Sequence, residues 1–253
     1  MINKAAALIR NARHTVVLTG AGISTPSGIP DFRSPGSGLW SNADPHVVAS
    51  MFGFRQHPEA FFEWIRPVAD VLLKAQPNPA HEALARLERL GHVQAIITQN
   101  IDMLHTRAGS QTVHEVHGSM AKGTCCTCYT TYAMTDFVDD FIRTGEIPRC
   151  PQDGGMIKPD VVLFGEALPY QQLDAALRAA RTCDLMIVAG SSLEVAPVSN
   201  MPEVALAHGA RLIVVNFEQT YIDHRADVVL HTDVARILPF IVDMVEDKVH
   251  DSD

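Results

Sequence analysis

The feature that most constrains the fold is an apolar strand pattern that ends in a glycine turn. The run Val16-Val17-Leu18-Thr19 leads directly into Gly20-Ala21-Gly22-Ile23-Ser24. Two glycines two residues apart let backbone N–H groups approach a pyrophosphate closely, and a helix that starts at such a turn directs its positive end at the anion. The pattern predicts a dinucleotide-binding turn, although a plain structural turn can carry the same two glycines.

The turn lacks one part of the fingerprint that is typical of dehydrogenases. In a G-x-G-x-x-G motif a third glycine would stand at position 25, where this chain has Thr25-Pro26. The sequence therefore argues against ordinary hydride transfer, and the function has to be inferred from the other motifs.

Composition narrows the class of protein. The chain has 253 residues, 47% of them hydrophobic, which is enough for a large core. Its net charge of −9 disfavours a general affinity for nucleic acid or anionic membranes and is compatible with a basic peptide partner. There is no run of about 18 apolar residues and no signal-peptide pattern, so we expect a soluble cytoplasmic protein without a membrane partner. The oligomeric state is not determined by the sequence.

Apolar strand patterns alternate with helix patterns along much of the chain. We expect helices at 2–13, 79–90, 171–181 and 202–208, strands at 93–98, 185–189, 212–215 and 228–230, and a last helix that is interrupted at Pro239. Continuous apolar strands separated by helices predict an α/β fold with a Rossmann-like, doubly wound parallel sheet.

Polar residues cluster where the strands of this sheet are expected to end. Gln99-Asn100-Ile101-Asp102 follows the strand at 93–98, and Gly190-Ser191-Ser192 and Asn216-Phe217-Glu218 follow later strands. Ligands of open α/β sheets bind at the carboxyl ends of the strands. These turns and the glycine turn therefore predict one shared site.

Two segments interrupt the α/β pattern and are expected to be inserted modules. Residues 35–78 carry Phe52, Phe54, Phe61, Phe62 and Trp64 and read as a small helical module whose aromatic rings form a core. Residues 120–156 hold four of the five cysteines and read as a small zinc-ribbon-like module. The Rossmann-type domain would then consist of 1–34, 79–119 and 157–253.

The cysteines have the spacing of a structural zinc site with one irregular ligand. Cys125 and Cys128 form a C-x-x-C-type pair, Cys150 follows, and Asp153 stands where a second pair would place its thiol. A carboxylate can bind zinc but matches it less well than sulfur. Three outcomes stay open: a Cys3Asp zinc site, a degenerate module without metal, or a site completed by Cys126 or water. The fifth cysteine, Cys183, is expected to be an inert core thiol.

His117 stands out among the histidines because of its expected neighbours. It precedes the cysteine module, and Asn100 and Asp102 lie in a polar loop with no evident packing role. A titratable base beside an amide and a carboxylate is a candidate catalytic constellation, although a lone histidine is often structural.

Several motifs in their order along the chain resemble those of sirtuins, the NAD-dependent protein deacylases, in their bacterial or archaeal form. They are G-A-G-I-S and G-I-P-D-F-R-S at 20–34, T-Q-N-I-D-M-L-H at 98–105, H-G-S at 117–119, the split cysteine pairs, V-L-F-G-E at 162–166, G-S-S-L at 190–193 and V-N-F-E at 215–218. The resemblance spans about residues 15 to 235.

The resemblance implies that NAD and an acyl-lysine peptide bind in a cleft between the domains, and that the acyl oxygen attacks C1′ of the nicotinamide ribose. His117 would act as the general base on the ribose hydroxyls, Asn100 would position the ribose or its water, and Asp102 would hold the nicotinamide amide. It implies these cofactor-binding residues: Gly20, Ala21, Gly22, Ser24, Ile29, Asp31, Phe32, Arg33, Gln99, Asn100, Ile101, Asp102, Gly190, Ser191, Ser192, Asn216, Glu218, Asp233 and Val234.

The resemblance also implies how acylated lysine-containing proteins or peptides would bind. The segment with Val162, Phe164, Gly165 and Glu166 would pair with the substrate backbone as an added strand, so target specificity should be broad. Sirtuins that remove succinyl or malonyl groups carry a tyrosine and an arginine three residues apart in the helical module, and this chain has Ile65 and Val68 at those places. An apolar pocket does not offset the cost of desolvating a carboxylate, so we expect neutral acyl groups to be preferred.

Two other readings use the same NAD pocket. An ADP-ribosyltransferase or NAD glycohydrolase would use a different nucleophile, and a non-catalytic NAD-sensing module would leave the cofactor intact. The H-G-S motif at 117–119 and the peptide-strand segment at 162–166 favour a deacylase over the first, and the presence of His117, Asn100 and Asp102 argues against the second.

Overall fold

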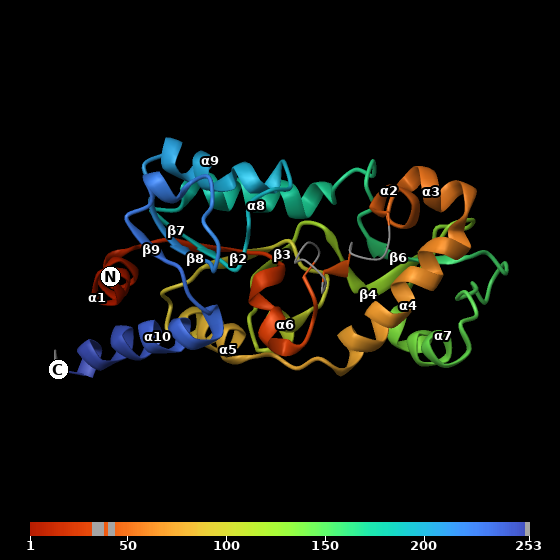
Figure 1. Ribbon diagram of the computed structural model, residues 1–253, viewed down its shortest axis with the longest axis horizontal. Coiled ribbons are helices and arrows are strands. Elements are labelled where there is room, and N and C mark those ends of the chain that lie inside the picture. The colour runs from red at the N-terminus through yellow and green to blue at the C-terminus, as the bar shows by residue number, and fades with distance from the viewer. Residues whose placement is uncertain (32–37, 40–43, 251–253) are drawn as a thin grey trace.

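The computed structural model describes residues 1–31, 38–39 and 44–250. Figure 1 shows an elongated molecule with a large sheet and its helices at one end and a smaller sheet with further helices at the other. Among the described residues, no helix has the length and apolar character needed to cross a membrane.

The large sheet confirms the predicted Rossmann-like architecture. Within the described residues its strands run in the order β3-β2-β1-β7-β8-β9, and all of its pairings are parallel. Numbered by appearance in this sheet, that order is 3-2-1-4-5-6, which is the doubly wound dinucleotide-binding order. The strands are β1 (Thr15–Thr19), β2 (Ala95–Thr98), β3 (Val113–Glu115), β7 (Leu185–Ala189), β8 (Arg211–Val215) and β9 (Val228–Leu230).

Helices cover both faces of this sheet. One face packs against α1 (Ile2–Asn11), α5 (Pro79–Arg89) and α10 (Val234–His250), and the other against α8 (Tyr170–Thr182) and α9 (Met201–Ala207). Successive residues of β1 alternate between the two cores: Val17 packs into the first, whereas Val16 and Leu18 pack into the second. Because strands buried on both faces must be apolar throughout, the sequence pattern located most of them.

Two local expectations were wrong. Helix α10 continues through Pro239, because its buried residues Leu238, Ile241 and Val242 hold it in the core shared with α1 and α5 despite the lost backbone hydrogen bond. The strand β3 was not expected, since two of its three residues are polar and all three are half-buried.

The helical module is built from α2 (Pro45–Val48), α3 (Met51–Gln56) and α4 (Pro58–Lys74). Phe54, Phe61 and Phe62 are buried and Phe61 packs edge-to-face on both others, with ring centroids 5.3 and 5.2 Å apart, which confirms the predicted aromatic core. Phe52 was wrongly counted in that core, because its side chain is 78% exposed on α3.

The cysteine module contains an antiparallel sheet in the order β5-β4-β6 among the described residues. Its strands are β4 (Gly118–Cys125), β5 (Thr131–Ala133) and β6 (Ile157–Val161), and α7 (Val138–Thr144) packs beside them. Phe141 of α7 meets Phe62 of α4 edge-to-face at 5.7 Å, so the two modules share a core. The other short elements are α6 (Leu104–Arg107) and the 3-10 helices η1 (Ala21–Ile23), η2 (Thr25–Ser27), η4 (Met134–Asp136), η5 (Val198–Asn200) and η6 (Asp223–Arg225).

Candidate active site

A cavity of about 870 Å³ is lined by the polar turns that follow β1, β2, β7 and β8. The four turns that were predicted to share a site therefore line one cavity. Predicted residues that line it are Gly20, Ala21, Gly22, Ile29, Asp31, Gln99, Asn100, His117, Gly190, Ser191, Ser192, Asn216, Glu218 and Val234. The lining also includes Thr25, Gly28, Pro30 and Phe217, which belong to the motifs and turns named above but were given no cofactor role, and Glu194 and Val195, which were not singled out.

The glycine turn packs directly against the turn after β7. Gly190 has φ +63°, and a Cβ there would overlap the backbone N of Ile23. A Cβ on Gly22 would lie 2.9 Å from the Gly190 carbonyl oxygen. The turn continues into the three-residue 3-10 helices η1 and η2, so the helix expected to direct a macrodipole at the anion is replaced by short turns. Backbone N–H groups at a close approach, rather than a long helix, would serve a pyrophosphate here.

Asn100, Ser24 and Asp102 form a buried hydrogen-bond network beside the cavity. Asn100 Nδ2 donates to the Gly20 carbonyl at 3.1 Å and to Ser24 Oγ at 3.0 Å. Ser24 Oγ donates to Asp102 Oδ2 at 2.6 Å. Burial raises the pKa of the Asp102 carboxyl above its usual value, while the hydrogen bonds from Ser24 and the Leu104 N–H favour its ionised form. Side chains from the loops after β1 and β2 are thus fixed to one another.

His117 lines the cavity with one ring nitrogen already engaged. Its Nδ1 lies 3.2 Å from the Gln99 carbonyl oxygen. Because a carbonyl only accepts, Nδ1 carries the proton of the neutral ring, and Nε2 keeps the lone pair that a base needs. Burial lowers the pKa of His117 below its usual value, so the ring is neutral near pH 7.

Two buried histidines lie behind this network and were missed by sequence reasoning. His81 Nδ1 accepts from the Asn78 N–H at 3.3 Å, so the proton sits on Nε2, which faces Ser24 Oγ at 3.5 Å. The rings of His81 and His105 meet edge-to-face at 4.9 Å, and His105 Nε2 lies 2.9 Å from Thr19 Oγ1. Burial lowers the pKa of His81 to about 4 and that of His105 well below its usual value. The position of His81 in the first turn of α5 was the one available signal.

A second pocket of about 40 Å³ adjoins the cavity and is almost wholly apolar. Predicted residues in its lining are Ala21, Ser24, Ile29, Asn100, Ile101, Asp102, Ile65 and Val68, and Pro30, Leu39, Trp64 and Leu72 complete it. The neighbouring Arg66 is held elsewhere: its Nε donates to the Ile142 carbonyl at 2.9 Å and its Nη2 to the Arg143 carbonyl at 3.2 Å, both in α7. Its guanidinium group is therefore engaged at the end of α7.

The expected peptide-binding segment is partly paired within the chain. The Phe164 N–H donates to the Ala49 carbonyl at 2.8 Å, and the Phe164 carbonyl accepts from the Met51 N–H at 2.9 Å. Val162 donates its N–H to the His117 carbonyl, and Glu166 forms an ion pair with Lys158 at 3.1 Å. Gly165 lies between these paired residues at φ +81°.

Three predicted cofactor residues are not found in the lining of either pocket. Phe32 and Arg33 lie outside the described residues. Asp233 is not among the residues that line the cavity. Its side chain instead accepts from the Ala235 N–H at 2.8 Å at the start of α10, beside Val234.

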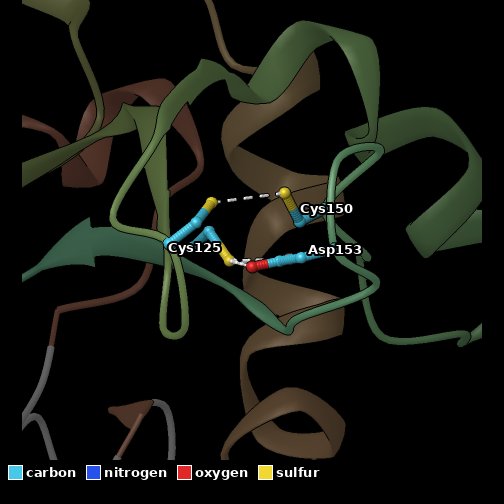
Figure 2. Close-up of side chains that lie close together, drawn as sticks. Cys125, Cys150 and Asp153 are labelled. Carbon is cyan, nitrogen blue, oxygen red and sulfur yellow. Dashed lines mark hydrogen bonds between the residues drawn. The ribbon is translucent and has the colours of Figure 1, made fainter.

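The cysteine module brings together the four predicted metal ligands. Figure 2 shows Cys125, Cys150 and Asp153 directed toward one another, and one ligand atom from each of Cys125, Cys128, Cys150 and Asp153 lies within 4.8 Å of all the others. Cys128 Sγ lies 3.6 Å from Cys150 Sγ, and Cys125 Sγ lies 3.4 Å from Asp153 Oδ1. Cys126 is exposed and is not part of this group.

These separations fit a tetrahedral zinc site. Bonds of about 2.3 Å to sulfur and about 2.0 Å to oxygen place two sulfur ligands about 3.8 Å apart, and a sulfur about 3.5 Å from a carboxylate oxygen. Four protein ligands leave no open position for a substrate, so the donor set suits a structural metal. Cys183 is buried, and burial raises its thiol pKa to about 11, as expected for an inert core thiol.

Comparison with known proteins gives consistent matches over nearly the whole chain. The model of the Sir2 family matches residues 20–197. The NAD-dependent protein deacylase 2 of Archaeoglobus fulgidus is 50% identical over 97% of this chain and 96% of its own length. The structure of Sir2Af2 bound to a myristoylated histone peptide is 44% identical, with a TM-score of 0.84 over 99% of this chain and 98% of that one. A Sir2 homologue solved as an NAD complex is 36% identical, with a TM-score of 0.89 over 97% and 94%.

Proposed function

Because this chain belongs to the Sir2 family, we propose that it is an NAD-dependent protein lysine deacylase that prefers neutral acyl groups. The observation that carries the proposal is the placement of His117, with Nε2 unprotonated, in the same cavity as Asn100 and the glycine turn. The substrates would be acyl-lysine peptides, as in the relative bound to a myristoylated histone peptide.

The cavity has the parts needed to hold NAD. Its close-packed glycine turns offer backbone N–H groups to the pyrophosphate, and Glu218, which follows β8, would accept hydrogen bonds from the adenosine ribose hydroxyls. The small apolar pocket beside Asn100 would take the nicotinamide ring, with Asp102 and Ile101 at its amide. Bound NAD supplies C1′ of its nicotinamide ribose as the acceptor of the acyl oxygen, with nicotinamide as the leaving group.

Residues of the chain would then orient the nicotinamide ribose and deprotonate one of its hydroxyls. The hydrogen bond from Asn100 to the Gly20 carbonyl fixes its amide at the rim between the two pockets, where it would position the ribose. His117 would take a proton from a ribose hydroxyl at Nε2, since Nδ1 is held by the Gln99 carbonyl. A lowered pKa keeps His117 in its neutral form and ready to accept this proton near pH 7.

The metal site fits a supporting role. Cys125, Cys128, Cys150 and Asp153 would hold zinc as a structural ion, and the module's small core of Met134 and Ile157 with two of the cysteines is too small to stabilise it alone. The module contributes Phe141 to the core that it shares with α4, and it would thereby support the helix that carries Ile65 and Val68.

The test compares nicotinamide release with loss of acetyl from an acetyl-lysine peptide. We expect equal amounts of both in the unaltered protein, and a loss of about 100-fold or more in His117→Ala. His114→Ala is the matched control, because His114 lies three residues away in β3 and does not line the cavity. Nicotinamide release without deacetylation would indicate a glycohydrolase or ADP-ribosyltransferase, and NAD binding without turnover would indicate a sensor.

The acyl preference has its own test. Ile65 and Val68 form the α4 side of the apolar pocket that we assign to nicotinamide, so an acyl group that reaches C1′ would lie against the same apolar face of α4. Arg66 is engaged at α7, and the described residues that line this pocket include no lysine or arginine. We expect acetyl-lysine to be turned over at least about tenfold faster than succinyl-lysine on the same peptide sequence. The variant Ile65→Tyr/Val68→Arg should narrow that ratio. Desuccinylation that rivals deacetylation in the unaltered protein would contradict the preference.

A further inference from the structure

The loop that follows β8 carries the residues at the adenosine end of the cavity. Asn216, Phe217 and Glu218 line the cavity, and the loop then runs to Asp223 at the start of η6. Within the loop, Asn216 Nδ2 donates to the Glu218 carbonyl at 2.9 Å. The position of Glu218 therefore depends on how firmly Asn216 and the rest of the loop are held.

His231 contacts both ends of this loop from the residue that follows β9. Its Nδ1 lies 3.1 Å from the Asn216 carbonyl oxygen, and its Nε2 lies 3.2 Å from Asp223 Oδ2. Asp223 is itself fixed, because Thr220 donates to it from its backbone N–H at 3.2 Å and from Oγ1 at 2.5 Å. The side chain of Asp223 is only 9% exposed, whereas that of His231 is 43% exposed.

Both groups that the His231 ring faces are hydrogen-bond acceptors. A backbone carbonyl and a carboxylate both accept hydrogen bonds, so the imidazolium form, with a proton on each nitrogen, satisfies both at once. The ring then closes the loop from Asn216 to Asp223 as a hydrogen-bonded bridge. The described contacts of His231 do not include the cavity, so it acts on a ligand only through the loop.

We propose that His231 is a positioning residue for NAD, because it holds the loop of Asn216 and Glu218 in its binding conformation. This inference rests on the proposed NAD-binding function of the same cavity. It assigns to His231 an effect on NAD affinity with no direct effect on the acyl peptide or on the chemical step.

The test measures NAD binding by calorimetry and the kinetic constants for both substrates. We expect His231→Ala to raise the Kd and KM for NAD about fivefold, with kcat and the KM for the peptide unchanged. Asp223→Asn should have a similar effect, and the double variant should be no worse than either single one. His231→Gln keeps one donor and should show an intermediate change. If His231 only stabilised the fold, His231→Ala would lower the unfolding temperature without raising the KM for NAD selectively over the KM for the peptide.

His224→Ala, directly after this loop in η6, is the matched control. His224 is also an exposed histidine whose Nδ1 faces a carbonyl, that of Tyr221 at 3.0 Å, but it does not join the ends of the loop. We expect its NAD affinity to be unchanged. If His231→Ala binds NAD as tightly as the unaltered protein, the inference is overturned.

A second readout separates this inference from the proposed function. Amide hydrogen exchange of residues 216–223 in the protein without NAD should become faster in His231→Ala and stay unchanged in His224→Ala. If the unaltered protein binds no NAD, the proposed function fails, while this exchange still decides whether His231 holds the loop. Unchanged exchange in His231→Ala would refute the bridge itself.

Discussion

The cofactor cavity and the cysteine module are stabilised in different ways. The cavity lies at the edge of a sheet that is buried between two large apolar cores, and its turns fit because glycine backbones touch. The cysteine module has a small core of its own, formed by Cys125, Met134, Cys150 and Ile157, and two of those four residues are candidate metal ligands. Packing holds the first region, whereas we expect the second to depend on a bound metal, so the two regions should respond to different perturbations.

The largest expected effect comes from removing the backbone contact in the cavity. Gly190→Ala adds a Cβ that overlaps the backbone N of Ile23, at a residue with φ +63°. We expect NAD affinity to fall by about 100-fold with unaltered zinc content, measured by calorimetry and elemental analysis.

Gly91→Ala separates the steric overlap from backbone strain. Gly91 also has positive φ, +79°, but a Cβ there would meet nothing within 4 Å. We expect only a small loss of stability and normal NAD binding in this variant. If Gly190→Ala behaves like Gly91→Ala, the close packing of the two turns does not matter for the cavity.

The next largest effect is the loss of folding stability at acidic pH. His81 has a pKa of about 4 in the folded protein and 6.5 as its ordinary value. As the pH falls, His81 in the unfolded chain binds a proton before His81 in the folded protein does. The stability that neutral His81 contributes is therefore fully present above about pH 6.5 and is lost as the pH falls toward 4. The loss between pH 7 and pH 5 should be on the order of 2 kcal/mol, measured by urea unfolding.

The variant His81→Asn should show a shallower dependence of stability on pH over the same range. His57→Asn is the control, because His57 is an exposed histidine at the start of α4. Equal slopes in the unaltered protein and in His81→Asn would contradict the role of buried His81.

The smallest expected effect concerns the irregular ligand of the metal module. Asp153→Cys replaces a hard oxygen ligand with a thiolate, which zinc prefers, so zinc should be retained at least about tenfold more tightly against a chelator. The variant Asp153→Ala should bind zinc more weakly than the unaltered protein does. NAD affinity should be the same in all three proteins. Equal zinc retention in all three would show that Asp153 is not a ligand.

The sequence predicted most strands of the large sheet, because a strand that is buried on both faces is a continuous apolar run. It also predicted the polar turns, because each one directly follows such a run at the carboxyl end of a strand. It also placed Cys125, Cys128, Cys150 and Asp153 together, since their spacing is local. Contacts between segments that are distant in the chain could not be predicted from the sequence. The His81–His105 pair joins α5 to α6, and Phe164 pairs with the segment from Ala49 to Met51.

One predicted cofactor residue, Asp233, has a structural role of its own. Asp233 follows β9 as a cofactor residue would, yet its carboxylate caps the first turn of α10. Arg66, next to Ile65 in the chain, is held by the Ile142 carbonyl in α7, a segment more than seventy residues away. The partner of Arg66 cannot be recognised from the neighbouring sequence, whereas an aspartate directly before a helix is itself an N-cap signal.

NAD-dependent deacylation is tested most directly by mass spectrometry of an acetyl-lysine peptide incubated with the protein, with and without NAD. We expect deacetylated peptide and O-acetyl-ADP-ribose to appear in equal amounts and only when NAD is present. Loss of acetyl without NAD, or consumption of NAD while the peptide stays acetylated, would contradict it.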